Sequence, residues 1–374
     1  MKKILFYTDT PLSGGAELQM LLLAKNLDKK KCTASLACGV NSSLDSWCSK
    51  WTEEGFAVHR VPTTSKHSLK HFFFVRKILK KERFDLVHLH LWNPASCRLA
   101  LLATRFSNIP YVVTEHDPFS LSTLKEWFRK KILGLPNAVI AVSDENKKFL
   151  LKRDPDFLNR IVRIYNGIDS TYFKSQLLGF TSEDREHFRK EQFSATPTDI
   201  VILNVATLHE RKGQEDLIEA FAIERVKNRR LVLVGDGPAR KKLEKLVNSK
   251  NLEDSVRFLG QRNDIPKLMR SADIFVLPSR REAFGLVVLE AAACELPIIA
   301  TSVGGVPEII TDGESGILVN QSDPKSIADA IKKMANDEGL RQRLARNAYE
   351  MVVTRFSTQK MAEETQKVYD TVLT

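Results

Sequence analysis

Short apolar runs alternate along the whole chain with longer segments in which apolar residues recur at helical spacing. A short apolar run between turn residues is typical of a buried strand, and helical spacing is typical of an amphipathic helix. The first such unit is the run KKILFYT, the loop DTPLSGG and the segment AELQMLLLAKNLDKK. Because strand, loop and helix repeat in this order, the sequence predicts an α/β protein.

The apolar runs predict strands at residues 2–8, 33–40, 57–62, 86–92, 111–117, 138–144, 199–208, 230–238, 255–260, 272–278, 296–305 and 315–320. Helical spacing predicts helices at residues 16–30, 72–84, 124–133, 182–192, 214–224, 239–250, 285–294, 324–335, 340–353 and 357–373. Strands alternate with helices in both halves of the chain. This alternation predicts two doubly wound, Rossmann-like domains with a ligand cleft between them.

A polar, charged stretch separates the two halves of this pattern, and the length of 374 residues suits about two domains. We therefore expect a first domain over residues 1–172, a connection over 173–198 and a second domain over 199–355. The last helix falls in the remaining segment, 356–374.

The formal net charge of +11 is concentrated in the first half of the chain. Residues 1–170 hold 27 Lys and Arg against 16 Asp and Glu, whereas residues 171–374 hold 30 of each. Such a surface suits an anionic partner, or is simply a solvated lysine-rich face. Nucleic acid is possible, but no known nucleic-acid motif is present, so the favoured partner is an anionic membrane. The helices predicted at 72–84 and 124–133 mix aromatic and basic residues, which suits either an interfacial face or a core stripe with a solvated side.

The five cysteines are odd in number and show no CxxC spacing. This usage fits buried thiols in a reducing cytoplasm and argues against a zinc site or a disulfide framework. The N-terminal stretch reaches Asp9 too early for a signal-peptide core, and no apolar run has membrane-spanning length. We therefore expect a cytoplasmic protein, either free or associated with the inner face of the membrane.

The stretch from Ser279 to Glu308 is the strongest candidate for a ligand site. Glu282 stands just before a helix predicted to start near Gly285, and Glu290 lies more than one turn inside it. The two carboxylates could face one cleft, because their angular offset around the helix is small. The plainer alternative is an amphipathic helix with two solvated glutamates.

The start of this helix is also a candidate anion site. Backbone N–H groups in the first turn of a helix have no partner within the helix and lie at its positive end. The amides of Phe284, Gly285 and Leu286 could therefore receive phosphate oxygens. A nucleotide-sugar, with a diphosphate between two hydroxyl-rich groups, suits an anion site between two carboxylates.

Two further loops lie at the carboxyl ends of predicted strands, where open α/β sheets bind ligands. Gly14 and Gly15 follow the first strand and could bring backbone N–H groups to a ligand, although the loop is neither a P-loop nor a GxGxxG motif. Lys212, in the loop LHERKG, could neutralise a diphosphate, or could be an ordinary exposed lysine.

Three histidines lie on or after neighbouring strands. His88 and His90 alternate in LVHLHLW and point to one face of the sheet. A zinc pair would need a third ligand at suitable spacing, so hydrogen-bonded strand histidines are the favoured interpretation. His116 ends the strand YVVTEHD at the edge where α/β active sites gather, which favours a functional role.

Taken together, these motifs resemble those of the retaining glycosyltransferases of family 4, also described as glycosyl transferases group 1. The matching features are SGGAE, TEHD, YNGID, RKGQEDLIEAF, LVGDGP, FLGQRNDIPKLMRSADIFVLPS, the pair of Glu282 and Glu290, and SVGGVPEII. They extend over nearly the whole chain in the order of the family. The resemblance implies the GT-B fold, in which two Rossmann-like domains face each other and the final helix, here 356–374, packs back on the first domain.

The resemblance also implies roles for residues of the second domain. Glu282 would contact the donor sugar, Glu290 would hold the ribose hydroxyls and Lys212 would neutralise the diphosphate. The remaining donor contacts would come from the amides of Phe284, Gly285 and Leu286.

In the first domain, the resemblance implies that Gly14 and Gly15 line the donor phosphate and that His116 lies near the reacting sugar. One position departs from the family pattern, because Thr207 replaces an arginine that usually precedes the lysine by five residues. One charge partner of the diphosphate is therefore missing. Either Arg211 takes its place, or transfer is slower or uses another donor geometry.

The expected activity is retaining transfer of a hexosyl unit from a nucleoside-diphosphate sugar to a hydroxyl of a glycan or lipid-linked acceptor. A UDP-sugar is the favoured donor and GDP-mannose the alternative, and the products would belong to cell-surface polysaccharide or glycolipid synthesis. No DxD signature follows a predicted strand, so we expect a metal-independent enzyme without a cofactor. The alternatives are a sugar-nucleotide epimerase of the same fold and a nucleotide-sugar-binding protein without turnover.

Overall fold

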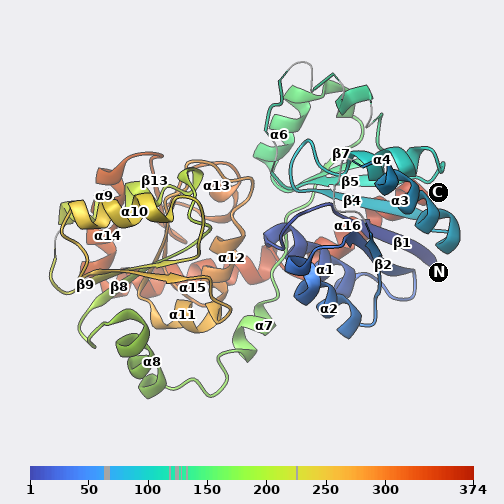
Figure 1. The fold of residues 1–374 in the computed structure, drawn as a ribbon. Coiled ribbons are helices and arrows are strands. Elements are labelled where there is room, and N and C mark those ends of the chain that lie inside the picture. Colours follow the sequence, from blue (N-terminus) through green and yellow to red (C-terminus); the bar gives the residue numbers. More distant parts are fainter. Residues whose placement is uncertain (63–67, 118, 123–125, 128, 132–133, 225) are drawn as a thin grey trace. The chain divides into compact units, whose positions relative to one another are not determined.

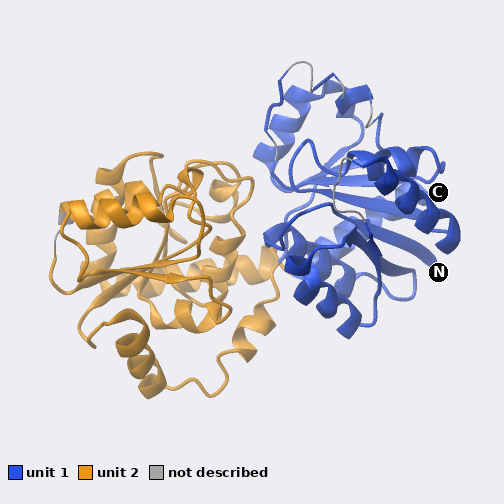
Figure 2. Cartoon of the chain, viewed as in Figure 1, with its two compact units in different colours: residues 1–167, 358–374 blue, residues 168–357 orange. Residues whose placement is uncertain are grey.

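The computed structural model describes residues 1–62, 68–117, 119–122, 126–127, 129–131, 134–224 and 226–374. The chain folds into two compact units (Figure 2). Unit 1 consists of residues 1–167 and 358–374, and unit 2 of residues 168–357. Each unit is built around one parallel sheet with helices packed against it (Figure 1), which confirms the predicted α/β class.

The sheet of unit 1 has seven parallel strands in the order β3-β2-β1-β4-β5-β6-β7. The strands are β1 Lys2–Tyr7, β2 Cys32–Gly39, β3 Ala57–Val61, β4 Leu86–Leu91, β5 Tyr111–Glu115, β6 Ala138–Ala141 and β7 Ile161–Arg163. The helices are α1 Gly15–Asn26, α2 Asp45–Glu53, α3 Leu69–Glu82, α4 Arg98–Arg105, α6 Asp144–Arg153 and α16 Thr358–Leu373. The chain reverses direction across the sheet between β1 and β4, which makes that point the topological switch.

The sheet of unit 1 is covered on both faces, as its nearly continuous apolar strands require. Successive side chains of β1 alternate between two apolar clusters, Ile4 and Phe6 in one, Leu5 and Tyr7 in the other. The first cluster includes residues of α1, α2 and α16, and the second includes residues of α3 and α4. The sheet is therefore the central layer of a three-layer unit.

The C-terminal helix α16 belongs to unit 1, although the chain passes through all of unit 2 before reaching it (Figure 1). It packs against α1 and contributes Tyr369, which is fully buried, to the core. The hydroxyl of Tyr369 lies 2.6 Å from Nδ1 of His88 on β4. The prediction that the last helix packs on the first Rossmann-like fold is confirmed.

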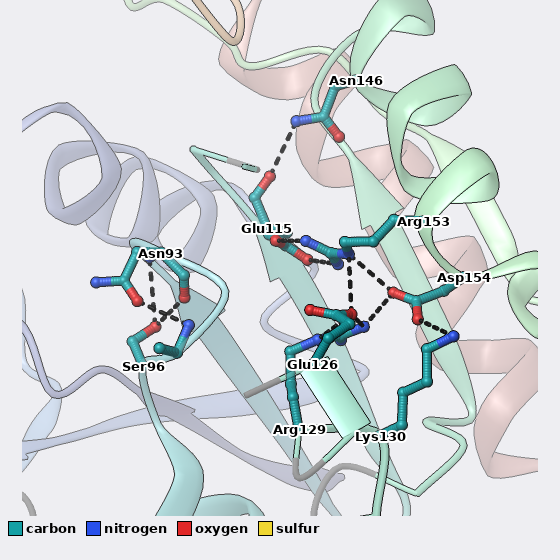
Figure 3. A network of polar contacts seen from close by, with 10 residues as sticks. Asn93, Ser96, Glu115, Glu126, Arg129, Lys130, Asn146, Arg153 and Asp154 are labelled. Atoms are coloured by element: carbon teal, nitrogen blue, oxygen red, sulfur yellow. Dashed lines mark hydrogen bonds and ion pairs between the residues drawn. The ribbon is translucent and has the colours of Figure 1, made fainter. Parts of the chain in front are cut away.

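The carboxyl end of β5 is held by a buried ion pair (Figure 3). Glu115, the last residue of β5, accepts two hydrogen bonds of 2.6 Å from the guanidinium of Arg153 at the end of α6. Asn146, also on α6, donates to the backbone carbonyl of Glu115 at 3.2 Å. These contacts fix the strand end immediately before His116, because a bidentate pair constrains both position and orientation.

The same network extends to the segment that follows β5 (Figure 3). Arg129 is buried and pairs with both Glu126 and Asp154, while Arg153 donates to Asp154 at 2.9 Å. Burial alone would raise the pKa of Asp154, but the neighbouring guanidinium groups of Arg129 and Arg153 bring it below its ordinary value. The charges compensate one another, as buried charges must.

The sheet of unit 2 has six parallel strands in the order β10-β9-β8-β11-β12-β13. The strands are β8 Ile200–Val205, β9 Arg229–Val234, β10 Val256–Gly260, β11 Ile274–Leu277, β12 Ile298–Thr301 and β13 Ile317–Val319. The helices are α7 Ser170–Ser175, α8 Ser182–Phe188, α9 Gln214–Glu224, α10 Arg240–Ser249, α11 Ile265–Ser271, α12 Leu286–Ala293, α13 Val306–Ile309, α14 Pro324–Asn336 and α15 Glu338–Arg355. Its topological switch lies between β8 and β11.

Each of the twelve predicted strands has a counterpart in the structure, but β7 was not predicted. With three residues, Ile161–Arg163, it is too short to give a periodic signal and exists because it pairs with β6. The helix predicted at 124–133 lies partly outside the described residues. The segment 173–198, expected as a connection, is assigned to unit 2, where Arg189 donates to the carboxylate of Asp273 at 2.8 Å.

Candidate active site

The topological switch of unit 2 brings two loops together at the carboxyl ends of neighbouring strands. The loop after β8 carries Thr207, Arg211 and Lys212, and the loop after β11 carries Glu282. The backbone carbonyl of Arg211 accepts hydrogen bonds from the amides of Arg280 at 2.8 Å and Arg281 at 3.3 Å. The loops are therefore joined along their backbones at the place where open α/β sheets bind ligands.

A lysine and a carboxylate meet where these loops join. Lys212 Nζ donates to Oε1 of Glu282 at 2.6 Å, and Ser279 Oγ donates to the same oxygen at 2.7 Å. The side chains of Lys212 and Glu282 are only 15% and 9% exposed. Charged side chains on a solvated surface are mostly exposed, whereas both members of this pair are nearly buried. The alternative of an ordinary exposed lysine at position 212 is therefore wrong.

Two glycines allow the loops to approach this closely. Gly213 and Gly304 both have positive φ, 66° and 54°, a region that L side chains rarely occupy. A Cβ on Gly213 would lie 2.0 Å from the carbonyl oxygen of Pro278, and one on Gly304 would lie 1.7 Å from the carbonyl oxygen of Glu282. The loops after β8 and β12 therefore pack directly on the backbone of the loop that carries Glu282.

The helix that follows Glu282 begins as the sequence predicts. α12 starts at Leu286, with Gly285 at its N-cap at φ 101°, and glycine has no side chain with which to cap the first turn. The ring of Phe284 is buried at 2% exposure and lies 5.8 Å from the ring of Phe356, so only its backbone can meet a ligand. The amides at this helix start remain a candidate anion site.

Glu290 lies in the second turn of α12 and differs from Glu282 in its surroundings. Within the described residues no donor faces its carboxylate, and burial raises its pKa to about 7. A half-buried carboxyl without a partner suits a ligand that brings its own hydroxyl donors. The two glutamates thus have different electrostatic environments, one paired with a lysine and one desolvated.

Thr207, at the position where the family pattern has arginine, is exposed, and its carbonyl accepts from Gln214 Nε2 at 3.1 Å. Arg280 is not free to replace the missing charge, because its guanidinium makes two hydrogen bonds, of 2.6 and 2.9 Å, with Asp216. Arg211, whose side chain is half-buried, is next to Lys212 in the chain. Arg211 therefore lies in the same loop as Lys212, at the position that the sequence analysis named as a possible second positive charge.

In unit 1 the structure places Gly14 and Gly15 at the start of α1, after the loop that follows β1. The amide of Gly14 donates to Oε2 of Glu17 at 2.9 Å, and burial raises the pKa of Glu17 above its ordinary value. In this structure the Gly14 amide is therefore occupied. Gly15 is the first residue of the helix, where an amide has no intrahelical acceptor.

His116 directly follows β5 and is half-buried. Its Nε2 lies 3.0 Å from Nδ1 of His90, and burial lowers the pKa of His116 to about 4. The ring is therefore neutral at physiological pH. Gly14, Gly15 and His116 all lie at the carboxyl edge of the sheet of unit 1, near its topological switch.

No group of three or more His, Cys, Asp and Glu side chains in the described parts of the chain is arranged to hold a metal ion. Among the same residues, no helix has both the length and the apolar character needed to cross a bilayer.

No individual role for Ser279, Gly213 or Gly304 was predicted from the sequence, although all three lie within the motifs singled out there. Ser279 orients Glu282, and the two glycines permit the loops to meet. The only signals in the sequence are the spacing of three residues between Ser279 and Glu282 and the pair of glycines in SVGG. Neither signal is specific without the contacts.

Two sequence profiles match the chain. The one described as Glycosyltransferase Family 4 matches residues 13–172, and the one described as Glycosyl transferases group 1 matches residues 184–351. An uncharacterized glycosyltransferase of Methanocaldococcus jannaschii is 30% identical over 324 residues, which cover 84% of each chain. The chain belongs to glycosyltransferase family 4.

Other relatives of this glycosyltransferase agree with the assignment. The chain is 24% identical over 380 residues to the UDP-Gal:alpha-D-GlcNAc-diphosphoundecaprenol alpha-1,3-galactosyltransferase of Escherichia coli, covering 96% of this chain and 94% of the relative. The crystal structure of an Anabaena protein in complex with UDP and glucose matches 99% of this chain and 100% of the other, with a TM-score of 0.86 and 23% identity. The resemblance seen in the sequence is confirmed, and the fold is GT-B.

We expect Gly304→Ala to damage the site of the glycosyltransferase through its contact with Glu282. A matched control is Gly313→Ala, because Gly313 also has positive φ, 71°, but a Cβ there would meet nothing within 4 Å. The control should lower the melting temperature of unit 2 by about 2–4 °C, which corresponds to about 1 kcal/mol of backbone strain. Gly304→Ala should lower it at least twice as far in the same thermal melt. Equal shifts for the two variants would show that the contact with Glu282 is unimportant.

Proposed function

We propose that the protein is a retaining glycosyltransferase that moves a hexosyl unit from a nucleoside-diphosphate sugar to a hydroxyl of a glycan or lipid-linked acceptor. A UDP-sugar is the favoured donor, and GDP-mannose is the alternative. The observation that carries the proposal is the cluster of Lys212, Glu282 and Ser279 at the topological switch of unit 2. A short loop connects Glu282 of this cluster to the start of α12.

Lys212 and Glu282 divide the work on the donor. Lys212 is held where it can face the diphosphate, and as the sugar leaves, negative charge grows on the phosphate oxygen. A nearly buried ammonium stabilises that charge more strongly than water does, because the local dielectric constant is lower. Glu282 accepts hydrogen bonds from hydroxyls of the donor sugar, and its contacts with Lys212 and Ser279 keep its orientation.

Residues at the start of α12 and within it make further contacts with the donor. The amides at its start, at Phe284, Gly285 and Leu286, receive oxygens of the diphosphate or sugar. Glu290 accepts hydrogen bonds from the two ribose hydroxyls, which suits a desolvated carboxyl that has no donor of its own among the described residues. Arg211 supplies the second positive charge that the family pattern places at position 207.

The reaction proceeds on one face of the sugar. The bond between the anomeric carbon and the phosphate oxygen breaks, the acceptor oxygen forms a new bond to that carbon from the same face, and its proton passes to the departing phosphate. Gly14 and Gly15 line the donor phosphate, and His116 lies near the reacting sugar. No step in this proposal requires a metal ion.

The proposed acceptor is membrane-linked, and a surface of unit 1 supports this. We call it the α3 patch: Leu69, Phe73, Arg76, Lys77, Lys80 and Lys81 on α3, with Phe106 at the end of α4. Leu69, Phe73 and Phe106 are 70%, 62% and 64% exposed, and Phe73 lies with the four basic residues around one shallow depression. Exposed aromatic side chains beside a row of cations suit the interface of an anionic bilayer. The product would then be a cell-surface polysaccharide or glycolipid.

The transfer itself is tested by the release of nucleoside diphosphate. We expect UDP release from a UDP-sugar only when a lipid-linked acceptor is present, and this release should not change with EDTA. From an α donor, NMR should show an α anomeric configuration in the product.

Lys212→Met should lower kcat by about 10²–10³-fold, as expected for loss of a preorganised charge. Lys241→Met, which removes an exposed lysine of α10, should not affect it. Isomerisation of the donor without acceptor would favour an epimerase, and binding without turnover would favour a non-catalytic protein.

The pKa of Glu290 makes donor binding depend on pH. Ribose hydroxyls donate to the charged carboxylate, so binding should release a proton from a group whose pKa is about 7 in the free protein. The affinity for a UDP-sugar, whose esterified diphosphate does not titrate in this range, should therefore fall about ten-fold between pH 8 and pH 6. Isothermal titration of Glu290→Gln should show weaker binding that is flat with pH. Parallel pH profiles in the two proteins would rule out this role.

Membrane contact is tested by co-sedimentation with vesicles of neutral or anionic phospholipid. The variant Lys77→Gln/Lys80→Gln/Lys81→Gln should bind anionic vesicles about one hundred-fold more weakly, because each cation contributes about 1 kcal/mol. Binding should also weaken with added salt. The matched control, Lys147→Gln/Lys148→Gln/Lys152→Gln, removes three positive charges from α6 and should bind like the parent protein. Equal loss in both variants would place the contact elsewhere.

A further inference from the structure

Three histidines form a row in unit 1, with His88 and His90 on β4 and His116 directly after the neighbouring strand β5. The rings of His88 and His90, two residues apart on β4, have centroids 4.1 Å apart, and the rings of His90 and His116 have centroids 5.3 Å apart and are stacked. Burial lowers the pKa of all three, so each ring is neutral and carries one proton. Where each proton lies therefore decides what His116 can offer a substrate.

His88 has a partner on both nitrogens. Its Nδ1 lies 2.6 Å from the hydroxyl of Tyr369, and its Nε2 lies 2.7 Å from the hydroxyl of Thr114. Because hydroxyls can donate or accept, His88 is satisfied in either tautomer. It therefore places no requirement on His90 beyond ring packing.

His90 is different, because only one of its nitrogens has a partner. Its Nδ1 lies 3.0 Å from Nε2 of His116, while its Nε2 is buried and has no hydrogen-bonding group near it among the described residues. If His116 donated to His90, the proton of His90 would be on Nε2 as a buried N–H without an acceptor. If His90 donates instead, Nε2 carries only a lone pair. Orphaned buried N–H donors are rarer than unsatisfied acceptors, which favours donation by His90.

We propose that His90 is a positioning residue that donates its Nδ1–H to Nε2 of His116 and thereby fixes His116 as the Nδ1–H tautomer. His116 is half-buried, and the described residues place no partner on its Nδ1. It therefore presents a neutral N–H donor, which binds a sugar or phosphate oxygen as an acceptor. The importance of this donor for transfer rests on the proposed function, but the tautomer does not.

The tautomer is measured directly in the full-length, substrate-free protein. We expect long-range ¹H–¹⁵N correlation spectra of histidine-labelled protein at pH 7.5 to show the Nδ1–H pattern for His116, assigned by the signals lost in His116→Gln. An Nε2–H pattern for His116 would overturn the proposal whether or not the protein has transferase activity.

Two conservative variants then test the effect on transfer. The amide nitrogen of Asn can take the place of Nδ1 of histidine, whereas that of Gln takes the place of Nε2, so His90→Asn keeps the donor and His90→Gln does not. We expect His90→Gln to mix the tautomers of His116 and to lower kcat/KM by about five- to ten-fold, the factor for one hydrogen bond. His90→Asn should keep both the single tautomer of His116 and the parental kcat/KM. His88→Gln, the control, should leave the His116 spectrum unchanged.

Two outcomes distinguish the positioning role of His90 from the role of His116 in transfer. If His90→Gln and His90→Asn lower kcat/KM equally while both proteins are folded, the role of His90 in positioning is overturned. If the Nδ1–H pattern is found but His116→Gln transfers at the parental rate, the place of His116 in the proposed function fails while the assigned tautomer stands.

Discussion

The ion pair between Lys212 and Glu282 depends on the close approach of three loops at one edge of a parallel sheet. Residues 70 positions apart are brought within 2.6 Å because β8 and β11 are neighbours in unit 2. Such an approach leaves no room for a Cβ at Gly213 or Gly304. Backbone contacts between the loops therefore determine where the charged side chains of the site lie.

The environments of the two glutamates differ in a way that suits two tasks. Glu282 accepts hydrogen bonds from an ammonium and a hydroxyl, which hold its carboxylate in one orientation. Glu290 has neither, and burial raises its pKa to about 7. A carboxyl of this kind is most stable as an anion when a ligand supplies donors, so its ionisation is coupled to ligand binding.

Unit 1 uses buried polar groups for a different purpose. The pair of Glu115 and Arg153 fixes the end of β5. The next residue, His116, lies within hydrogen-bonding distance of His90 on the neighbouring strand β4. Tyr369 from α16 completes the row through His88. A buried polar group is costly without a partner, so each of these contacts restricts the orientation of the next side chain. The row of histidines therefore connects α16 to the carboxyl edge of the sheet.

Local patterns in the sequence were enough to predict the α/β class, twelve of the thirteen strands found in the described residues and the start of the helix after Glu282, because periodicity and turn residues are properties of neighbouring positions. They also indicated Lys212 and Glu282 in loops after predicted strands, His116 at the end of a strand and Glu290 within the helix that follows Glu282. Only the tertiary structure decided that Lys212 pairs with Glu282, that Glu290 is desolvated and that the Gly14 amide is occupied by Glu17. It also revealed β7 and the buried network around Arg153. These features depend on which strands become neighbours and on what each side chain loses to solvent, and neither is encoded in the spacing of residues along the chain.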